Sequence, residues 1–206
     1  MKASVPALVV ILPALAYAEP TKPEPLVESR TWTRAADGAT FVGSVLHVRD
    51  GQAVFADASG KWYAAPLSAL AADDQAMINV SAKFAPKIPA GHLVGATRAQ
   101  AAILLGPPKS SYPDFDSWPF PVGAEACEFF IKVKGGKIGG FMLDLGWQRG
   151  LADLLDALGL DHFAPGRPNV AGPIETINLI ATGQPLLKFR GTKDTAGWSP
   201  VNIDIE

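Results

Sequence analysis

The sequence predicts an α+β protein in which a short β-rich unit is followed by a larger unit of helices layered on an antiparallel sheet. The 206 residues include 20 glycines and 18 prolines, a composition that favours turns and short strands over long helices. The first half of the chain carries β-rich runs separated by tight-turn pairs, and the second half carries helical, hairpin and strand patterns in turn. A coiled coil, a helical bundle and a collagen-like rod are excluded.

Residues 1–18 have the pattern of a secretory signal peptide. Lys2 precedes an apolar run from Val5 to Leu15, and Ala16-Tyr17-Ala18 offers the small residues that a signal peptidase reads. The run of about 11 residues is well short of the ~20 needed to span a bilayer. We therefore expect a soluble exported protein, periplasmic or extracellular, with no membrane insertion after cleavage. No cysteine lies at the end of the apolar run, so we expect no lipid anchor.

The charge balance argues against two classes of partner. A formal net charge of −2 and a pI of about 5.9 give no general attraction for nucleic acid or anionic lipid. The lone Cys127 cannot form an intrachain disulfide, and alternation in residues 127–133 makes it a buried strand residue. We expect a fold held together by its core.

Two proline-bearing segments divide the chain. Residues 19–29 read as an extended linker after the signal peptide, and residues 79–90 as a second linker without helical or strand periodicity. The predicted units are therefore residues 30–78 and 91–206.

The first unit reads as a β-meander. Residues 30–33, 41–48, 52–57 and 61–67 form the predicted strands, with tight turns at Asp50-Gly51 and Ser59-Gly60 and a helical turn at the end. Because this unit has only about 50 residues, its sheet has to curl on itself to bury a core.

The ordered spacing of residues 30–78 resembles the homology domain first described in the yeast endocytic adaptor Sla-one. The pattern is R-x-W, D-G, x-G-K, P-L and L-x-x-x-D-Q, carried here by Arg30, Trp32, Asp50-Gly51, Gly60-Lys61, Pro66-Leu67, Leu70 and Asp74-Gln75. The resemblance implies a small Src-homology-3-like β-barrel that binds short peptides. One departure is Ala71 in place of the usual helix-capping Ser, and Ser68 offers a cap one turn earlier.

Aromatic residues are the candidate contacts of this first unit. Trp32, Trp62 and Tyr63 have the area and stacking ability that short-peptide recognition uses, although packing within the core is the competing interpretation for each. Trp62 and Tyr63 are neighbours in a strand and must face opposite sides, so we expect one in the core and the other exposed.

The second unit has clear start and stop signals. Thr97 is expected to cap a helix over residues 98–105 that ends at Gly106. Residues 122–133 and 137–145 are expected to form a hairpin across Gly135-Gly136, followed by a helix over 150–158 and strands over 175–181, 185–190 and 201–205. This order predicts an antiparallel sheet covered on one side.

A proline-rich aromatic segment, residues 110–121, lies between the first helix and the hairpin. Because it contains three prolines it cannot form a regular helix, so we expect a lid folded over the sheet or a recognition loop. Proline-stiffened aromatic side chains lose little entropy on binding. The candidate binding residues are Tyr112, Phe115, Trp118 and Phe120.

Residues 91–145 are similar, more weakly, to the SmpA/BamE and β-lactamase-inhibitor-protein group of exported binding domains. Gly95 and Thr97, the Leu105-Gly106 pair with Pro108, and the run Asp116-x-Trp118-x-Phe120 carry the likeness. The outer-membrane branch of that group is lipidated, which puts its assembly role in doubt for this chain.

The sequence argues against catalysis, a cofactor and a metal site. His47, His92 and His162 share no metal-ligand spacing, and no H-E-x-x-H, C-x-x-C or G-x-S-x-G motif occurs. We therefore expect a non-catalytic, adaptor-like protein of the bacterial envelope that binds peptide or protein partners through aromatic surface. The alternatives are an envelope structural or assembly factor acting through the second unit, and an enzyme or enzyme accessory with an unrecognised site.

Overall fold

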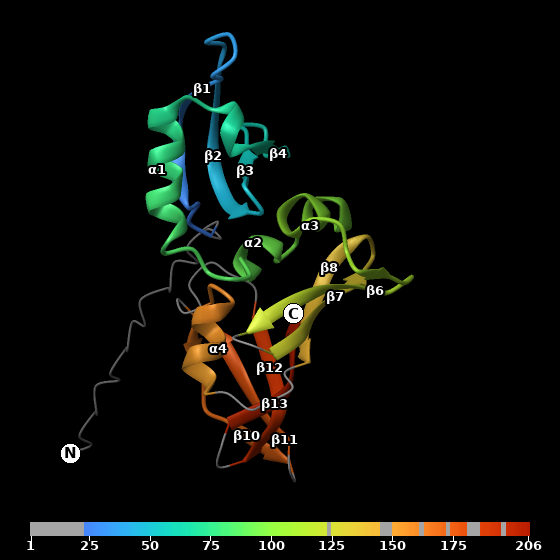
Figure 1. Ribbon diagram of the computed structural model, residues 1–206. Helices are drawn as coiled ribbons and strands as arrows, with labels where there is room; N and C mark the ends of the chain where they lie inside the picture. The colour runs from blue at the N-terminus through green and yellow to red at the C-terminus, as the bar shows by residue number, and fades with distance from the viewer. Residues whose placement is uncertain are drawn as a thin grey trace, which may run out of the picture.

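The computed structural model describes residues 23–122, 125–144, 150–160, 163–171, 174–180, 186–194 and 197–206. It is a mixed α+β structure with two antiparallel sheets, one in each half of the chain, and helices between and beside them (Figure 1). No helix among these residues has the length and apolar character to cross a membrane. The predicted signal peptide and residues 19–22 of the predicted linker lie outside the described residues.

The first sheet is a four-stranded meander in the order β1-β2-β3-β4, formed by Val27–Thr33, Thr40–Arg49, Gln52–Ala56 and Trp62–Pro66. The β2–β3 turn uses the predicted pair, Asp50 and Gly51, both at positive φ (47° and 72°). The first strand begins at Val27, so the predicted linker over 19–29 is wrong at its end. Leu26 and Val27 pack against the core of this unit, which explains the earlier start.

The closed barrel expected for the first unit is not shown. Strand order is linear, and among the described residues no ladder joins β1 to β4. The chain does return to β1 after the 3-10 helix η1 (Leu67–Ala69), where Leu70 forms an isolated bridge with Arg34.

Helix α1 (Ala72–Ala82) follows and packs against one face of the first sheet (Figure 1). It extends through the first four residues of the predicted second linker. Its N-cap is Ala71, which makes no side-chain cap, and Ser68 lies in η1 and does not cap α1. Asp74 instead accepts a hydrogen bond from the Thr33 amide at 2.8 Å, which fixes the helix to β1.

The second sheet has nine strands in the order β10-β11-β12-β13-β8-β7-β6-β5, with β9 paired to β11. Its strands are β5 (Ser110–Ser111), β6 (Phe115–Val122), β7 (Glu125–Lys134), β8 (Lys137–Asp144), β9 (Ala164–Pro165), β10 (Asn169–Ala171), β11 (Ile174–Ile180), β12 (Leu187–Asp194) and β13 (Gly197–Ile205). The hairpin turn at Gly135 and Gly136, both at positive φ, is confirmed.

Helices α2 (Ala90–Leu93), α3 (Arg98–Leu105) and α4 (Leu151–Ala157) cover one face of this sheet. The predicted cap of α3 is confirmed as a full capping box: the Thr97 hydroxyl accepts from the Gln100 amide at 3.2 Å and the Gln100 side chain accepts from the Thr97 amide at 2.9 Å. Gly106 ends the helix at φ 90°.

Most of residues 110–121 form strands β5 and β6, and not the lid or loop that the sequence suggested; residues 112–114 are the turn between the two strands. Pro119 and Pro121 lie opposite Glu128 and Ala126 of β7, beyond the end of the two-residue β5. Among the described residues, no strand pairs with the outer side of β6 at these two positions. A proline is tolerated there because no neighbouring strand requires a hydrogen bond from its backbone nitrogen.

The structure has two hydrophobic clusters, and the larger one contains side chains from both halves of the chain. A small cluster around Trp32, Phe55 and Ile78 lies between the first sheet and α1. The larger cluster lies on the helix-covered face of the second sheet and includes Leu46 and Val54 of the first sheet. The first sheet is therefore packed on both faces, and α3 lies between the two sheets (Figure 1).

Candidate functional site

The turn between β5 and β6 is held in place by α3. Arg98 donates hydrogen bonds from Nη2 to the carbonyl oxygens of Tyr112 (2.7 Å) and Pro113 (3.1 Å). Its Nε lies 2.9 Å from Oδ2 of Asp116, a buried carboxylate whose other oxygen accepts from the Ser111 hydroxyl. A buried charge with a paired, hydrogen-bonded environment fixes the local geometry. The turn is therefore a rigid platform.

This platform presents stacked aromatic rings to solvent. Tyr112 and Phe115 stack with centroids 4.4 Å apart, and Phe130 of β7 meets Phe115 edge-on at 6.1 Å. Tyr112 is 51% exposed and Phe115 36% exposed. Met142 of β8 lies directly opposite Phe130 in the ladder. We call Tyr112, Phe115, Phe130 and Met142 the aromatic patch.

The aromatic patch faces away from the helices. Phe129 and Ile131 of β7 are buried under the helices, and alternation along the strand places Phe130 on the opposite face. The same alternation along β6 separates Phe115 from the buried Asp116 and Trp118. The open face of the second sheet therefore carries a cluster of large apolar side chains beside its β5 edge.

Paired charges surround the aromatic patch. Lys109 pairs with Glu128, and Asp204 accepts from Lys132 at 3.0 Å and from Arg190 at 2.5 Å. Burial opposes ionisation of Asp204, but the hydrogen bonds and charges of the two cations together lower its pKa below the ordinary value. An apolar centre with a polar, charge-compensated rim is the arrangement found at protein interfaces.

The edge of β6 is poorly suited to strand addition. Residues 117, 119 and 121 share one orientation in the ladder, and the carbonyl of Ser117 points outward to accept from the Lys109 amide at 2.7 Å. The next two positions on that side are Pro119 and Pro121, which have no amide to donate. Contacts at this edge therefore have to come from side chains.

Trp32 is not on a surface, contrary to its selection as a contact residue. It is 0% exposed, its indole Nε1 donates to the Gly43 carbonyl at 2.7 Å, and its ring meets Phe55 edge-on. The fold uses it as the centre of the first unit's core.

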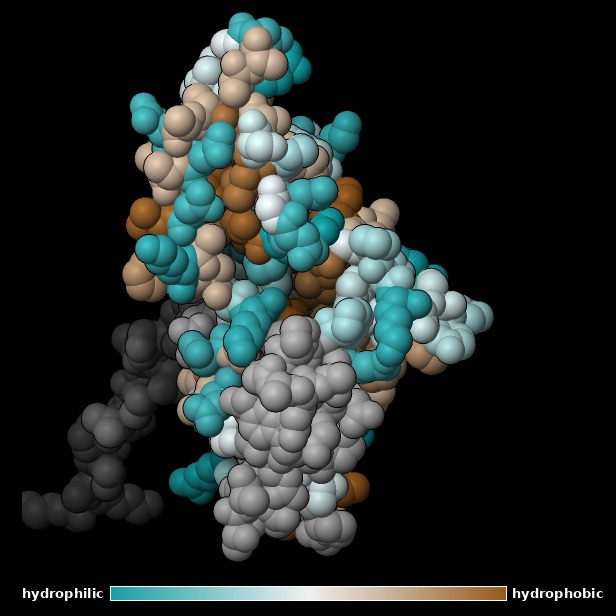
Figure 2. Space-filling view, viewed as in Figure 1, coloured by the Kyte–Doolittle hydropathy of each residue, from teal (hydrophilic) through white to brown (hydrophobic). Residues whose placement is uncertain are grey.

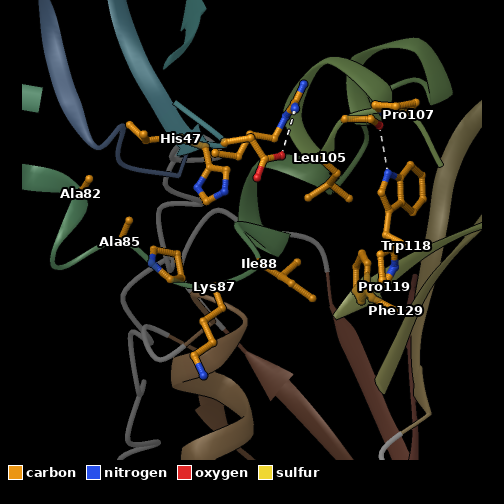
Figure 3. A pocket seen from close by; sticks show the side chains of 15 residues that line it. His47, Ala82, Ala85, Lys87, Ile88, Leu105, Pro107, Trp118, Pro119 and Phe129 are labelled. Atoms are coloured by element: carbon orange, nitrogen blue, oxygen red, sulfur yellow. Dashed lines mark hydrogen bonds and ion pairs between the residues drawn. The ribbon is translucent and has the colours of Figure 1, made fainter. Parts of the chain in front are cut away.

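Trp118 is also internal, with 5% exposure. Its indole Nε1 donates to the carbonyl of Gly106 at 2.9 Å (Figure 3), which joins β6 to the end of α3. A buried tryptophan with its only donor satisfied is a packing element. The side chain of Phe120 lies outside the described residues.

Trp62 and Tyr63 face opposite sides of β4, as alternation requires, but both are half-buried and neither is the exposed residue that we expected. Tyr63 stacks on Phe55 inside the first unit, whereas Trp62 packs toward the larger core. The outer face of the sheet is covered in part, because residues of α2 and α3 share the larger core with it.

The sequence reasoning missed Arg98, Phe130 and Met142. The Arg98–Asp116 pair brings together α3 and β6, and Phe130 joins the aromatic patch only through the β6–β7 ladder. The doublet Phe129-Phe130 in an alternating strand was the available signal, because one of the two rings has to leave the core.

A cleft of about 750 Å³ lies between the two halves of the molecule (Figure 3). Its lining includes His47, Arg49 and Lys87. His47 Nδ1 is buried and has no hydrogen-bond partner among the described residues. Burial, reinforced by the charges of His92 and Arg49, lowers the pKa of His47 to about 4. No group of three or more metal-ligating side chains gathers in the part of the chain that the structure describes.

A second apolar surface lies on α1 and just beyond its end, where Met77 and Val80 of the helix and the following Phe84 are exposed. Figure 2 shows apolar side chains at the surface of the first unit, interspersed with polar ones. Arg30 donates to the sulfur of Met77 at 2.6 Å, but no ring among the described residues stacks on Phe84, so the aromatic patch is the better-ordered candidate.

Comparisons of the chain with protein-family models, with curated proteins and with solved structures found no match.

Proposed function

We propose that this chain is a non-catalytic protein-binding protein that holds its partner at the aromatic patch. The observation that carries the proposal is the solvent-exposed stack of Tyr112 on Phe115. Arg98 holds the backbone of this turn by donating to the carbonyl oxygen of Tyr112. Exposed rings cost free energy in an isolated protein, and rigid rings lose little entropy when a partner covers them. Exposed aromatic clusters with a polar rim are characteristic of interaction sites.

The first unit fits a peptide-binding type of barrel, as its resemblance to the Sla-one homology domain implies. The Ala35 amide donates to Ala69 (2.9 Å) and the Ala71 amide donates to Thr33 (2.8 Å), so the segment after η1 lies alongside the end of β1. Such a return after a 3-10 helix supports partial closure of the meander. The Src-homology-3-like assignment remains our proposal.

We also propose that the protein acts outside the cytoplasm, as an adaptor in the bacterial envelope. The signal-peptide pattern of residues 1–18 supports export. An open sheet face flanked by a helical layer is compatible with the proposed likeness of the second unit to exported binding domains, and it supports binding over catalysis.

The experiment is an affinity capture from an envelope fraction with matched variants. The test variant is Tyr112→Ala/Phe115→Ala, and the control is Ile174→Ala/Ile180→Ala, which removes exposed apolar side chains from the same sheet face at its other end. We expect one set of proteins that wild type and control retain and the test variant loses. If the test variant captures the same proteins as wild type and the control variant, the proposal is contradicted.

A further inference from the structure

The outer face of the first sheet bears a groove distinct from the aromatic patch. It encloses about 460 Å³ and has three walls: strands β2–β4, the segment that joins α2 to α3, and the chain before β1. Trp62 and Leu46 come from the first wall, His92 and Val94 from the second, and Pro23 and Pro25 from the third. We call this the Trp62 groove.

The third wall is itself an extended proline-containing peptide. Pro23 and Pro25 are half-buried while Glu24 between them is exposed. The imidazole of His92 interacts with the backbone of Glu24, and Leu26 packs against the core of the first unit. The segment is therefore docked on the groove through two prolines and one backbone contact.

The groove offers the groups that recognise such a peptide. Proline fixes φ near −65°, so a Pro-x-Pro segment is already extended and loses little entropy on docking. Its rings pack on flat aromatic surfaces, and its carbonyl oxygens need donors. Trp62 supplies an indole, and His92 supplies a ring N–H. Burial lowers the pKa of His92 to about 4, although its interaction with the Glu24 backbone opposes this, so the ring is neutral at pH 7 and carries one N–H.

Charge at the groove narrows the class of peptide. Glu28 and Asp57 both line it. A peptide with Lys or Arg beside its prolines is therefore favoured over an acidic one. The chain's own segment follows this rule in sequence, because Lys22 precedes Pro23.

We propose that the Trp62 groove binds an extended, proline-containing peptide with an adjacent basic residue, and that Pro23–Pro25 is an internal strap that competes with it. The proposal rests on the peptide-binding role proposed for the first unit and names its site and its class of peptide; it does not depend on the aromatic patch. A tethered competitor acts at an effective concentration that reaches the millimolar range, so the strap weakens binding of an external peptide without abolishing it.

The probe is a synthetic peptide with the sequence of Glu19–Leu26 and the single change Glu24→Lys, EPTKPKPL, so that basic residues stand beside its prolines; it is titrated into the full chain by calorimetry. A second peptide with alanine at its three prolines is the matched control. The strap variant is Pro23→Ala/Pro25→Ala. We expect the strap variant to bind the proline peptide at least tenfold more tightly than wild type, and no protein to bind the alanine peptide.

Two further variants assign the site. Trp62→Ala, in the strap-variant background, is expected to weaken binding at least tenfold. His92→Phe, in the same background, keeps a ring but removes the N–H donor, and it is also expected to weaken binding. Circular dichroism checks that each variant is folded. If Trp62→Ala does not fold, the binding measured with His92→Phe decides whether the groove is the site. Tyr112→Ala/Phe115→Ala is expected to leave peptide binding unchanged, so failure here is distinguishable from failure at the aromatic patch.

Absence of binding to the strap variant, or binding that the Trp62 and His92 changes leave intact, would overturn the groove assignment. Equal affinity of wild type and strap variant would overturn the competition by Pro23–Pro25.

Discussion

Arg49, at the end of β2, donates from Nε to the carbonyl oxygen of Leu104 at the end of α3, across 3.1 Å. Its Nη2 donates to the next carbonyl back, that of Ile103, at 3.3 Å. The last carbonyls of a helix have no partner within the helix, and they carry the negative end of its dipole. A cation from the first sheet therefore completes a helix of the second unit and joins the two halves of the molecule.

Replacing Arg49 should destabilise the whole chain. Arg49→Met keeps most of the apolar stem but removes the donors, and we expect a loss of about 1–3 kcal/mol in the free energy of unfolding. Urea denaturation followed by circular dichroism measures it. Arg34→Met, which removes the exposed ion pair with Asp37, is the control and should cause a much smaller change. Equal losses in the free energy of unfolding for the two variants would contradict the role of Arg49 in joining the two halves of the molecule.

Asp116 should be the most sensitive carboxylate of the second unit. Asp116→Asn leaves Arg98 facing a neutral amide in a buried site, and we expect a loss of about 2–4 kcal/mol. Hydrogen exchange at the amides of Tyr112 and Phe115 should accelerate, because the turn loses its clamp. Asp114→Asn, at an exposed position in the same turn, is the matched control. An unchanged exchange rate at Tyr112 would contradict the account of the platform.

Acid should weaken the fold through His47 and His92. Burial, the largest cause for both, lowers the two pKa values from 6.5 to about 4. Between pH 6.5 and pH 4 the unfolded chain binds more protons than the folded chain. The stability that the two neutral imidazoles contribute is therefore fully present above pH 6.5 and is lost as the pH falls toward 4. The loss is roughly 3 kcal/mol for each ring.

Urea denaturation at several pH values between 4 and 7 measures this slope. His47→Gln should reduce it by about half. A variant that keeps the full wild-type slope would show that carboxylates, not the imidazoles, are responsible.

Two adjacent glycines of β8 should respond differently to alanine. A Cβ at Gly140 would lie 2.7 Å from the carbonyl oxygen of Ile203, which is fixed backbone of β13. A Cβ at Gly139 would lie 3.1 Å from the Cβ of Lys134, a tight contact that needs a smaller shift to relieve it. We expect Gly140→Ala to cost about 1–3 kcal/mol and Gly139→Ala less than about 1 kcal/mol. Thermal denaturation tests the order, and a reversed order would contradict the close packing of β8 on β13.

Local signals in the sequence predicted the elements well. The cap at Thr97, the stop at Gly106 and the turn at Asp50-Gly51 depend on neighbouring residues only, and each forms as expected. Local signals did not predict the strands β5 and β6 within residues 110–121. Prolines count against strands in general, but they are tolerated on an edge, and the edge exists only because β5 is two residues long.

The candidate site was harder to predict, because burial is a property of tertiary contacts. Trp32 and Trp118 were chosen for their area, yet the fold uses that area internally and satisfies each indole with a backbone carbonyl. Tyr112 and Phe115 are exposed, as the recognition hypothesis required of them. Phe130 reaches them through a strand ladder whose register the sequence does not reveal.

The central claim is that a partner covers the aromatic patch, and site-specific photo-crosslinking tests it most directly. A photoreactive p-benzoylphenylalanine replaces Tyr112 in one protein and Ile174, on the same sheet face, in another. After irradiation with an envelope fraction, the account predicts a discrete covalent adduct at position 112 and none at position 174. No adduct at position 112, or the same adducts at both positions, would contradict it.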